Sequence, residues 1–528
     1  MFKKIWLVLI TLIVEMFLFN AAGQADTKQP VVLFMYDSLN IDNNKAENVY
    51  SLNRLLVSTG CNVQMMQIDE YQAGELDDDK YDGVVTLINW PEHEQSNKAL
   101  DEDRLNFNGI QIHIGDNMNL NEMNDINGET ISYHQREFIL KDPDRKVEQH
   151  LPQLDKLTVF DQLSSDTTTI GSLKIQGQDH EYPYGIISRN QGYVPYYASD
   201  DDSTFLLATL IKRMFNLPNR VNPPLLTIGG VTPYTDLALL KKITRYLKQT
   251  KRTFAISATI SDGNFDLYAY QKFVNELNRV TNSGGLLFIK NPYVGDSGPS
   301  DSNIDKLQRQ TQDGVNHLID RNVYPIGLGL DEYWLRDNTY KKGYGDSSNT
   351  QILFPNPKQF GFAQQDNYSK TVKNSIYAVE MNQINSDLRG TTLNNVDFHA
   401  DIPLAITFEM PDNTKKLKQL ENEIKNIKFK LFTNDENDIE TQLSTSDHDI
   451  AYSNHQYLLD NKIANRDNVK VTIKRAPKYQ PVENWGNKFF NSQNRIMWFF
   501  FGITFVILGI FLVKGRKIYL KMFKRHND

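Results

Sequence analysis

Cysteine is almost absent from this chain of 528 residues, because Cys61 is the only one. A single thiol excludes an internal disulfide bond. Cys61 begins an apolar strand pattern and does not stand at a turn between a strand and a helix. This position predicts a structural side chain and not a nucleophile.

Two further absences argue against nucleic acid and nucleotides as partners. The formal net charge is −8, and acidic surfaces bind the phosphates of nucleic acid poorly. The first turn from a strand to a helix, at residues 36–38, has no glycine-rich phosphate fingerprint, so no nucleotide site is predicted.

The N-terminus has the order of a secretory signal. Lys3 and Lys4 precede an apolar run at residues 5–19, and small residues follow at 21–25. Glu15 interrupts the run, so residues 1–25 are either a cleaved signal peptide or a signal anchor that is retained.

The C-terminus predicts a membrane span. Residues 496–513 are uncharged and apolar, long enough at 1.5 Å per residue to cross a hydrocarbon layer of about 30 Å. The tail at 514–528 is basic and is expected in the cytoplasm; its cations are Lys514, Arg516, Lys517, Lys521, Lys524 and Arg525. The chain is therefore predicted to be a single-pass protein of the cell membrane with its bulk outside. An exported chain without disulfides favours the surface of a Gram-positive bacterium.

Residues 30–216 predict the first domain. Apolar runs at 31–35, 61–68 and 83–88 have the pattern of buried strands, and residues 49–56 that of a helix between the first two. Further strands are predicted at 110–114 and 131–140, and a closing helix at 204–215. This opening of a parallel α/β sheet resembles the Rossmann-like domains related to class I glutamine amidotransferases, which often serve as non-catalytic accessories.

Residues 222–411 predict a second domain in which strands and helices alternate strictly. Strands are predicted at 225–228, 252–259, 286–289 and 323–328, with a closing strand at 403–409. Such alternation is typical of a parallel sheet or a (β/α) barrel. The polar region 412–491 predicts a small α+β module or a stalk, with a helix at 414–427 and strands at 429–432 and 469–473.

Three segments of the second domain resemble an uncharacterised polysaccharide-deacetylase-like family, related to carbohydrate esterase family four. They are LTIGGVTPYTD at 226–236, GGLLFI at 284–289 and YPIG at 324–327. The resemblance implies a deformed (β/α) barrel. In that family one aspartate is the base, and a second aspartate and two histidines bind a divalent metal that activates water.

This sequence departs from the family at each of those positions. Gly229 and Gly230 replace the two aspartates, and Lys290 and Val294 replace the two histidines. A glycine offers no ligand atom and a lysine ammonium repels a cation, so the resemblance implies that the metal site is lost. No cofactor and no metal are expected.

Two other groups of residues are candidates for a site. Asp331, Glu332, Tyr333 and Trp334 follow the fourth predicted strand, at the end of a barrel where binding sites form. Carboxylates and aromatic rings are side chains that bind sugars. The alternative is that these residues form a loop whose aromatic ring is packed in the protein. Asp397, His399 and Asp401 alternate, so on a strand they face one side, where they either bind a cation or form a relay. The alternative is a solvated strand face or a hydrogen-bonded pair.

These observations predict a membrane-anchored, non-catalytic pseudo-deacetylase. It would bind or guide a cell-surface polysaccharide or an exopolysaccharide, or scaffold the membrane glycosyltransferase complex that makes it. One alternative is an active carbohydrate deacetylase or glycosidase with a shifted site, using Asp331, Glu332, Asp397, His399 or Asp401. Another is a structural or signalling surface protein without a sugar ligand.

Overall fold

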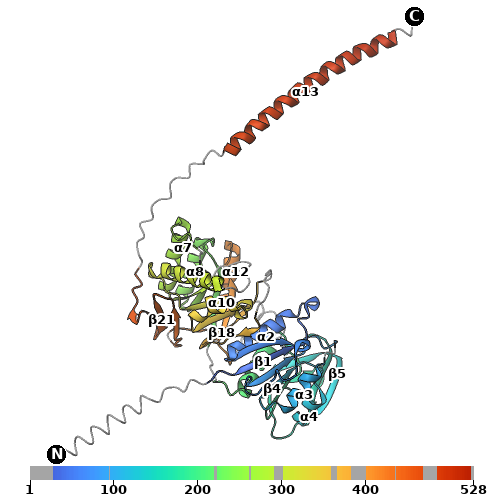
Figure 1. Ribbon diagram of the computed structural model, residues 1–528, viewed down its shortest axis with the longest axis vertical. Helices are drawn as coiled ribbons and strands as arrows, with labels where there is room; N and C mark the ends of the chain where they lie inside the picture. The colour runs from blue at the N-terminus through green and yellow to red at the C-terminus, as the bar shows by residue number, and fades with distance from the viewer. Residues whose placement is uncertain are drawn as a thin grey trace, which may run out of the picture. The chain divides into compact units, whose positions relative to one another are not determined.

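The computed structural model describes residues 28–93, 96–218, 223–260, 263–290, 301–357, 366–381, 400–434, 436–467 and 485–524. It forms two compact units, residues 1–470 and 471–528. The first unit contains an N-terminal domain with an open sheet, coloured blue to green in Figure 1, and a closed barrel, coloured green to orange. The fold is therefore mixed α/β, as the sequence predicts.

The first domain is built on a ten-stranded sheet in the order β17-β2-β1-β3-β4-β11-β10-β9-β6-β7. Its parallel part comprises β1 (Val31–Tyr36), β2 (Asn62–Gln67), β3 (Gly83–Leu87), β4 (Ile110–Ile114) and β11 (Gln191–Val194). Its antiparallel part comprises β10 (Glu181–Ser188), β9 (Thr168–Ile175), β6 (Phe138–Asp142) and β7 (Val147–His150). The helices are α2 (Ala46–Thr59), α3 (Lys98–Asn106), α4 (Leu120–Ile126) and α5 (Ser203–Met214). The parallel part confirms the predicted Rossmann-like sheet.

One predicted strand of this domain is divided in the structure. Residues 131–140 were expected to form one strand, but β5 (Glu129–Arg136) pairs with β8 (Leu154–Asp161) in a separate two-stranded sheet, and β6 begins at Phe138. Gln135 has a φ of 51°, which takes the chain out of extended geometry close to the division.

Strand β1 shows why the sheet is buried on both faces. Val32 and Phe34 belong to one apolar cluster, whereas Leu33 and Met35 belong to another. Successive side chains of a strand point to opposite faces, so an unbroken apolar run is needed where both faces are covered.

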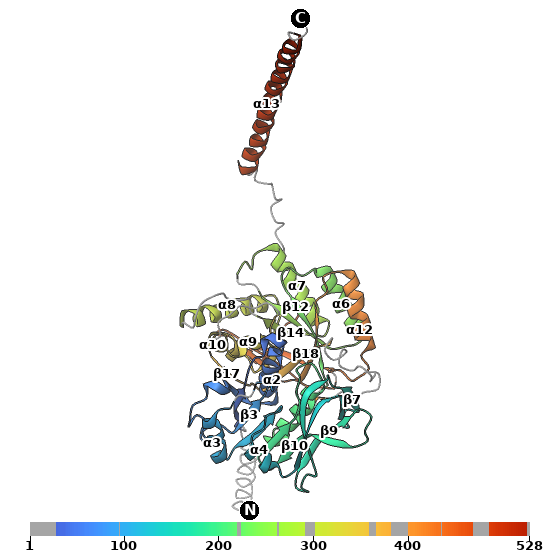
Figure 2. The ribbon, with the colours of Figure 1, turned by 90° about the vertical axis from the view of Figure 1, so that its right-hand side faces the viewer.

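Seven parallel strands form the closed barrel, in the order β12-β13-β14-β15-β16-β18-β19. Their bounds are β12 (Leu225–Val231), β13 (Phe254–Thr259), β14 (Gly285–Lys290), β15 (Gly327–Asp331), β16 (Thr350–Phe354), β18 (Asn374–Glu380) and β19 (Leu404–Glu409). The helices are α6 (Leu237–Gln249), α7 (Tyr268–Asn282), α8 (Asp301–Ile319), α9 (Glu332–Leu335), α10 (Asn338–Gly343) and α12 (Thr414–Asn426). Figure 2 shows α6, α7 and α8 around the barrel strands, and α12 packs on α6.

Two predicted elements after β14 differ from the structure. The fourth strand was expected at 323–328 but is β15, Gly327–Asp331, because the buried residues before it include Pro325, which cannot donate to a ladder. Residues 429–432 are not a strand; Phe429, Leu431 and Phe432 are buried without joining a sheet. The expected strand at 469–473 lies outside the described residues.

A small antiparallel sheet follows the barrel. It contains β20 (Thr441–Ser444), β21 (Asp449–Ser453), β22 (Gln456–Leu459) and β23 (Lys462–Ile463) in sequence order. Contacts join β20 to β15 and β16, so this sheet packs on the barrel.

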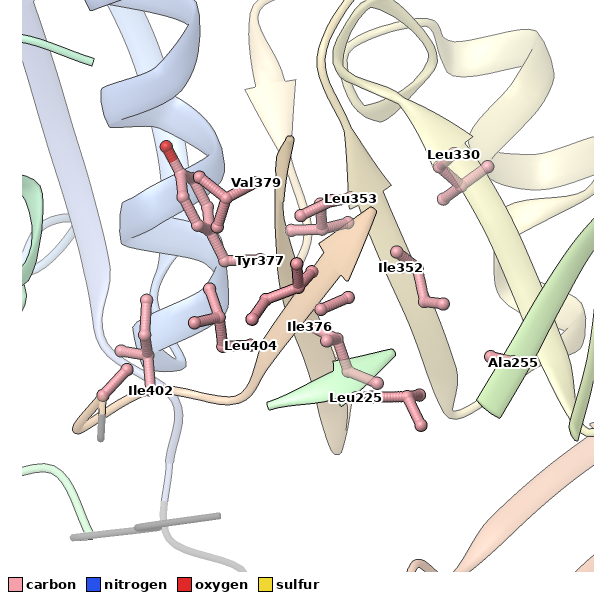
Figure 3. Packing of buried hydrophobic residues seen from close by; sticks show 14 of the residues in the cluster. Leu225, Ala255, Leu330, Ile352, Leu353, Ile376, Tyr377, Val379, Ile402 and Leu404 are labelled. Atoms are coloured by element: carbon pink, nitrogen blue, oxygen red, sulfur yellow. The ribbon is translucent and has the colours of Figure 1, made fainter. Parts of the chain in front are cut away.

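The first domain and the barrel are interlocked. The connection from β16 to β18 carries β17 (Tyr368–Ser369), which pairs with β2 at the edge of the first domain's sheet. In return, α2 of the first domain packs against β18. Figure 3 shows Tyr377 and Val379 of β18 beside this helix, and Tyr377 hydrogen-bonds Ser51 of α2. Helix α2 thus covers a barrel strand from outside.

The second unit contains one long helix, α13 (Trp485–Lys524). Its segment Ile496–Met522 is long and apolar enough to cross a membrane. This candidate span is consistent with single-pass membrane anchoring.

Candidate functional site

The carboxyl ends of the barrel strands form the candidate site. All seven strands are parallel, so their last residues lie at one end of the barrel, where barrel proteins build their sites. We call this end the barrel mouth; it comprises Gly229, Gly230, Tyr234, Thr259, Lys290, Asp331, Phe354, Glu380 and Glu409.

An ion pair between Lys290 and Asp331 joins two neighbouring strand ends at the mouth. The Lys290 Nζ donates to Asp331 Oδ1 at 2.6 Å and lies 5.7 Å from the centre of the Phe354 ring. Asp331 is 7% exposed, and burial raises the pKa of its carboxyl, while Lys290 opposes that rise. The pair therefore occupies a position that the resemblance assigns to a metal ligand.

Glu409, at the end of β19, lies over the two glycines of β12. A Cβ atom on Gly230 would lie 2.5 Å from Glu409 Oε2, and the φ of Gly230 is 69°, a value that favours glycine. A Cβ atom on Gly229 would meet nothing closer than 3.9 Å. A side chain at position 230 would therefore be strained by the backbone conformation and would displace the Glu409 carboxylate, whereas position 229 has room for a Cβ atom.

An exposed aromatic ring follows these glycines in the chain. Tyr234 lies three residues beyond the end of β12 and is 97% exposed. Glu380 and Glu409 are also exposed. Tyrosine rings stack on apolar sugar faces and attract cations, and exposed carboxylates accept hydrogen bonds and attract cations.

Glu332 and Tyr333, two of the predicted ligand residues, are buried. Glu332 is 0% exposed; its Oε1 accepts from Arg336 Nε at 2.8 Å, and its Oε2 accepts from Asn356 at 2.9 Å. Tyr333 is buried, and its backbone amide donates to Asn356 Oδ1 at 2.8 Å. Trp334 is half-buried with its ring stacked on Tyr340 at 3.5 Å between centroids.

Glu332 belongs to a polar cluster between the first domain and the barrel. We call this cluster the domain junction; it comprises Glu47, Asn53, Arg54, Glu332 and Arg336. Arg54 of α2 donates to the carbonyl of Ala378 at 3.2 Å and to Glu47 at 2.5 Å, and Asn53 donates to Glu332 at 3.2 Å. Burial raises the pKa of Glu47, and Arg54 opposes the rise. These contacts stabilise the packing of α2 on the barrel.

Asp401 lies at the opposite end of the barrel from Asp331. It precedes β19, whose first residue is Leu404, whereas Asp331 is the last residue of β15. The Asp401 carboxylate accepts from Thr209 of α5 at 2.6 Å, and its carbonyl accepts from Lys212. Asp331 and Asp401 therefore do not share one site.

Three other predicted positions, Val294, Asp397 and His399, lie outside the described residues. Within those residues, no group of three or more His, Cys, Asp and Glu side chains is arranged to hold a metal ion. Cys61 is buried, and burial raises the pKa of its thiol to about 12, so it is a poor nucleophile.

Sequence reasoning missed several residues that the structure brings to the mouth or the junction. Glu409 is the last residue of a predicted strand, so the rule that barrel sites form at strand ends could have found it. Glu380 ends β18, a strand that was not predicted. Tyr234 lies inside a quoted motif, but only its exposure marks it. Arg54 carries no sequence signal for its role at the junction, because the barrel carbonyls to which it donates, those of Leu353 and Ala378, lie about 300 residues later in the chain.

Comparisons with known proteins do not assign this chain to a family. No family model and no curated protein matches it. A ThuA-like protein from Parabacteroides merdae, known from its crystal structure, is similar at 12% identity and a TM-score of 0.26. The match covers 37% of this chain and 94% of that protein. A TM-score this low carries no argument about the fold or the function of this chain.

Proposed function

We propose that this chain is a membrane-anchored, extracytoplasmic pseudo-deacetylase whose barrel mouth binds a cell-surface or secreted polysaccharide without hydrolysing it. The observation that supports this proposal is the set of side chains found at the barrel mouth. Lys290 pairs with Asp331, the Glu409 carboxylate lies beside Gly230, and Tyr234 is exposed in the segment that follows β12.

The ion pair is the argument against hydrolysis. A general base or a metal ligand needs a carboxylate whose lone pairs can reach water or a cation. The Asp331 carboxylate instead accepts from an ammonium at 2.6 Å, and a metal beside Lys290 would face a like charge.

The exposed groups are the argument for a sugar, and for a cationic one. Glu409 and Tyr234 offer an anion and an aromatic face to solvent. A partly deacetylated amino-sugar polymer carries ammonium groups and apolar ring faces, so it complements both. The same surface suits guiding such a polymer from a membrane glycosyltransferase complex.

The extracytoplasmic orientation is supported by the charges beside the candidate span. Lys514, Arg516, Lys517 and Lys521 follow its apolar core, and such cations stay on the cytoplasmic side. In a Cys61→Ala background, a membrane-impermeant maleimide should label Ser446→Cys in intact cells but not Lys521→Cys. Labelling of the second variant alone would reverse the orientation.

The binding test uses the full chain in detergent with oligomers of glucosamine and of N-acetylglucosamine. We expect the glucosamine oligomers to bind more tightly and to be weakened by salt, because salt screens exposed charges. Glu409→Gln should weaken binding severalfold, whereas Glu102→Gln, which removes an exposed acid of α3 in the first domain, should not.

The hydrolysis test measures acetate release from the same N-acetylglucosamine oligomers with zinc or cobalt added. No release together with binding supports the proposal. Metal-dependent release would overturn the non-catalytic assignment, and failure of both oligomers to bind would overturn the sugar ligand.

A further inference from the structure

The first domain contains a polar cavity of about 240 Å³ that is separate from the barrel mouth. Helix α3 contributes Arg104 and Leu105 to its wall, α4 contributes Asn121 and Glu122, and Gln111 of β4 lies among the lining residues. The cavity therefore lies where two helices cover the parallel sheet.

The strand beneath the cavity has polar residues where a covered parallel sheet is normally apolar. In β4, Ile112 and Ile114 belong to the main apolar core, while the alternate residues Gln111 and His113 face the other side and are 4% and 3% exposed. Burying polar groups costs free energy unless each is hydrogen-bonded, and the sheet gains no apolar packing from them. Such a departure from ordinary core chemistry is typical of a functional site.

The buried polar groups are held in fixed positions. Arg104 Nε donates to Gln111 Oε1 at 3.0 Å, and the Gln111 amide donates to the Arg104 carbonyl at 3.0 Å. Arg104 also pairs with Glu122, which lies 3.1 Å from His113 Nδ1. Burial raises the pKa of Glu122, but His113 and Arg104 together bring it well below its usual range, so the Arg104–Glu122 pair stays charged at neutral pH.

The charges of the lining nearly cancel. Glu122 neutralises Arg104 inside the cavity, and at the rim Arg189 stands with Asp101 and Asp125. Phosphate and carboxylate ligands are held by an excess of cations, which this lining lacks. Side-chain amides such as Asn121 and Gln191, by contrast, both donate and accept hydrogen bonds, which matches hydroxyl groups.

The rim also offers an apolar contact. Leu105 is 62% exposed on α3 and lines the cavity beside the buried Phe107. A sugar ring presents both hydroxyl groups and an apolar face. We propose that this cavity binds one neutral sugar residue, as a second carbohydrate site distinct from the barrel mouth.

The test uses saturation-transfer NMR on the full chain in detergent, with N-acetylglucosamine, galactose and glucose 6-phosphate as probes. We expect one of the neutral sugars to bind and the phosphate ester not to. Asn121→Trp should fill the cavity and weaken binding at least tenfold. Asn124→Trp is the matched control, because Asn124 is exposed on the same helix but does not line the cavity.

Three results would overturn the inference: no binding of either neutral sugar, tighter binding of glucose 6-phosphate, or equal binding by the two tryptophan variants. Leu105→Ala provides a second variant that leaves the buried network intact and should also weaken binding. The two proposed sites can be told apart with the same variants. If Glu409→Gln abolished the binding of neutral sugars and Asn121→Trp left it unchanged, the sugar would bind at the barrel mouth and not in this cavity.

Discussion

The barrel mouth and the domain junction both gather charged side chains, and two consecutive carboxylates divide between them. Asp331 ends β15 and faces Lys290, whose side chain is 31% exposed. Glu332 begins α9 and is buried against Arg336, Asn53 and Asn356. Adjacent residues thus place one carboxylate in an ion pair whose lysine is reached by water, and the other in a buried network that joins two domains.

The difference shows that burial of the partner, and not the type of residue, decides what a carboxylate does. An ion pair that water can reach contributes little to stability, and its members are replaceable. A buried pair is costly to break, because removing one member leaves an uncompensated charge in the interior. The junction should therefore matter for stability and the mouth for ligand binding.

The largest expected effect is that of Glu332→Ala at the junction. It leaves the Arg336 guanidinium, itself 5% exposed, without its carboxylate, at a cost of about 3–5 kcal/mol. Asp331→Asn is the matched control at the adjacent residue and should cost less than about 1 kcal/mol, because Lys290 can be hydrated. Unfolding of the full chain by guanidinium chloride measures both, and equal losses would abolish the distinction between the two regions.

A buried carboxyl that has no arginine partner should make the free energy of unfolding depend on pH. Asp201 is 8% exposed and accepts from the Ser203 amide at 2.9 Å. Burial raises its pKa to about 7, while bonds from Ser203 and Tyr196 oppose the rise. The folded state thus holds this proton more tightly than the unfolded chain does.

The contribution of Asp201 to stability is complete below about pH 4, the pKa of an unfolded aspartate, and is lost as the pH rises through about 7. The loss approaches about 1.4 kcal/mol per pH unit in that range. Burial also raises the pKa of the neighbouring Asp202, to about 6, so the contribution of Asp201 is measured between pH 6 and 7. Asp201→Asn should remove the slope of the unfolding free energy in that interval, whereas Asp200→Asn, at an exposed neighbour, should keep it. An unchanged slope in Asp201→Asn would mean that the carboxyl is ionised throughout.

Local sequence patterns predicted the strands well where apolar runs are continuous. β1 and β12 to β14 follow such runs, and the Rossmann-like sheet, the barrel-forming alternation and the apolar C-terminal helix are all observed. Closure of the barrel depends on pairing β12 with β19, about 180 residues apart, and no local pattern reveals it. The relation of this barrel to polysaccharide deacetylases stays a prediction.

The parts that could not be predicted depend on contacts across long stretches of chain. β17 has only two residues, Tyr368 and Ser369, too few to show a period, yet it completes the edge of a sheet formed by residues before 195. Glu332 and Arg336 do have a local signal, the spacing of four residues on a helix. This spacing alone could have predicted that Glu332 is a structural residue paired with Arg336, without knowledge of its contact with Asn53.

Within the mouth, the two glycines should respond differently to a methyl group. Gly230→Ala forces a Cβ against Glu409 and holds alanine at a φ of 69°, which costs about 1–2 kcal/mol. Gly229→Ala meets only ordinary contacts and should change the free energy of unfolding by less than about 0.5 kcal/mol. Thermal unfolding of the two variants measures the difference, and equal stability would show that neither the backbone conformation at position 230 nor Glu409 penalises a side chain there.

The smallest effect on stability, and the sharpest on function, is expected at Tyr234. Because its side chain is 97% exposed, Tyr234→Ala should alter the free energy of unfolding by less than about 0.5 kcal/mol. Its loss should weaken binding of glucosamine oligomers about fivefold, equivalent to about 1 kcal/mol of cation–π attraction. Tyr268→Ala is the matched control, since the Lys272 ammonium lies 4.1 Å from the centre of that ring and repels a cationic sugar. If both substitutions weakened binding equally, ring faces and not charge would govern the mouth; if neither did, the ligand would not contact this side of the barrel.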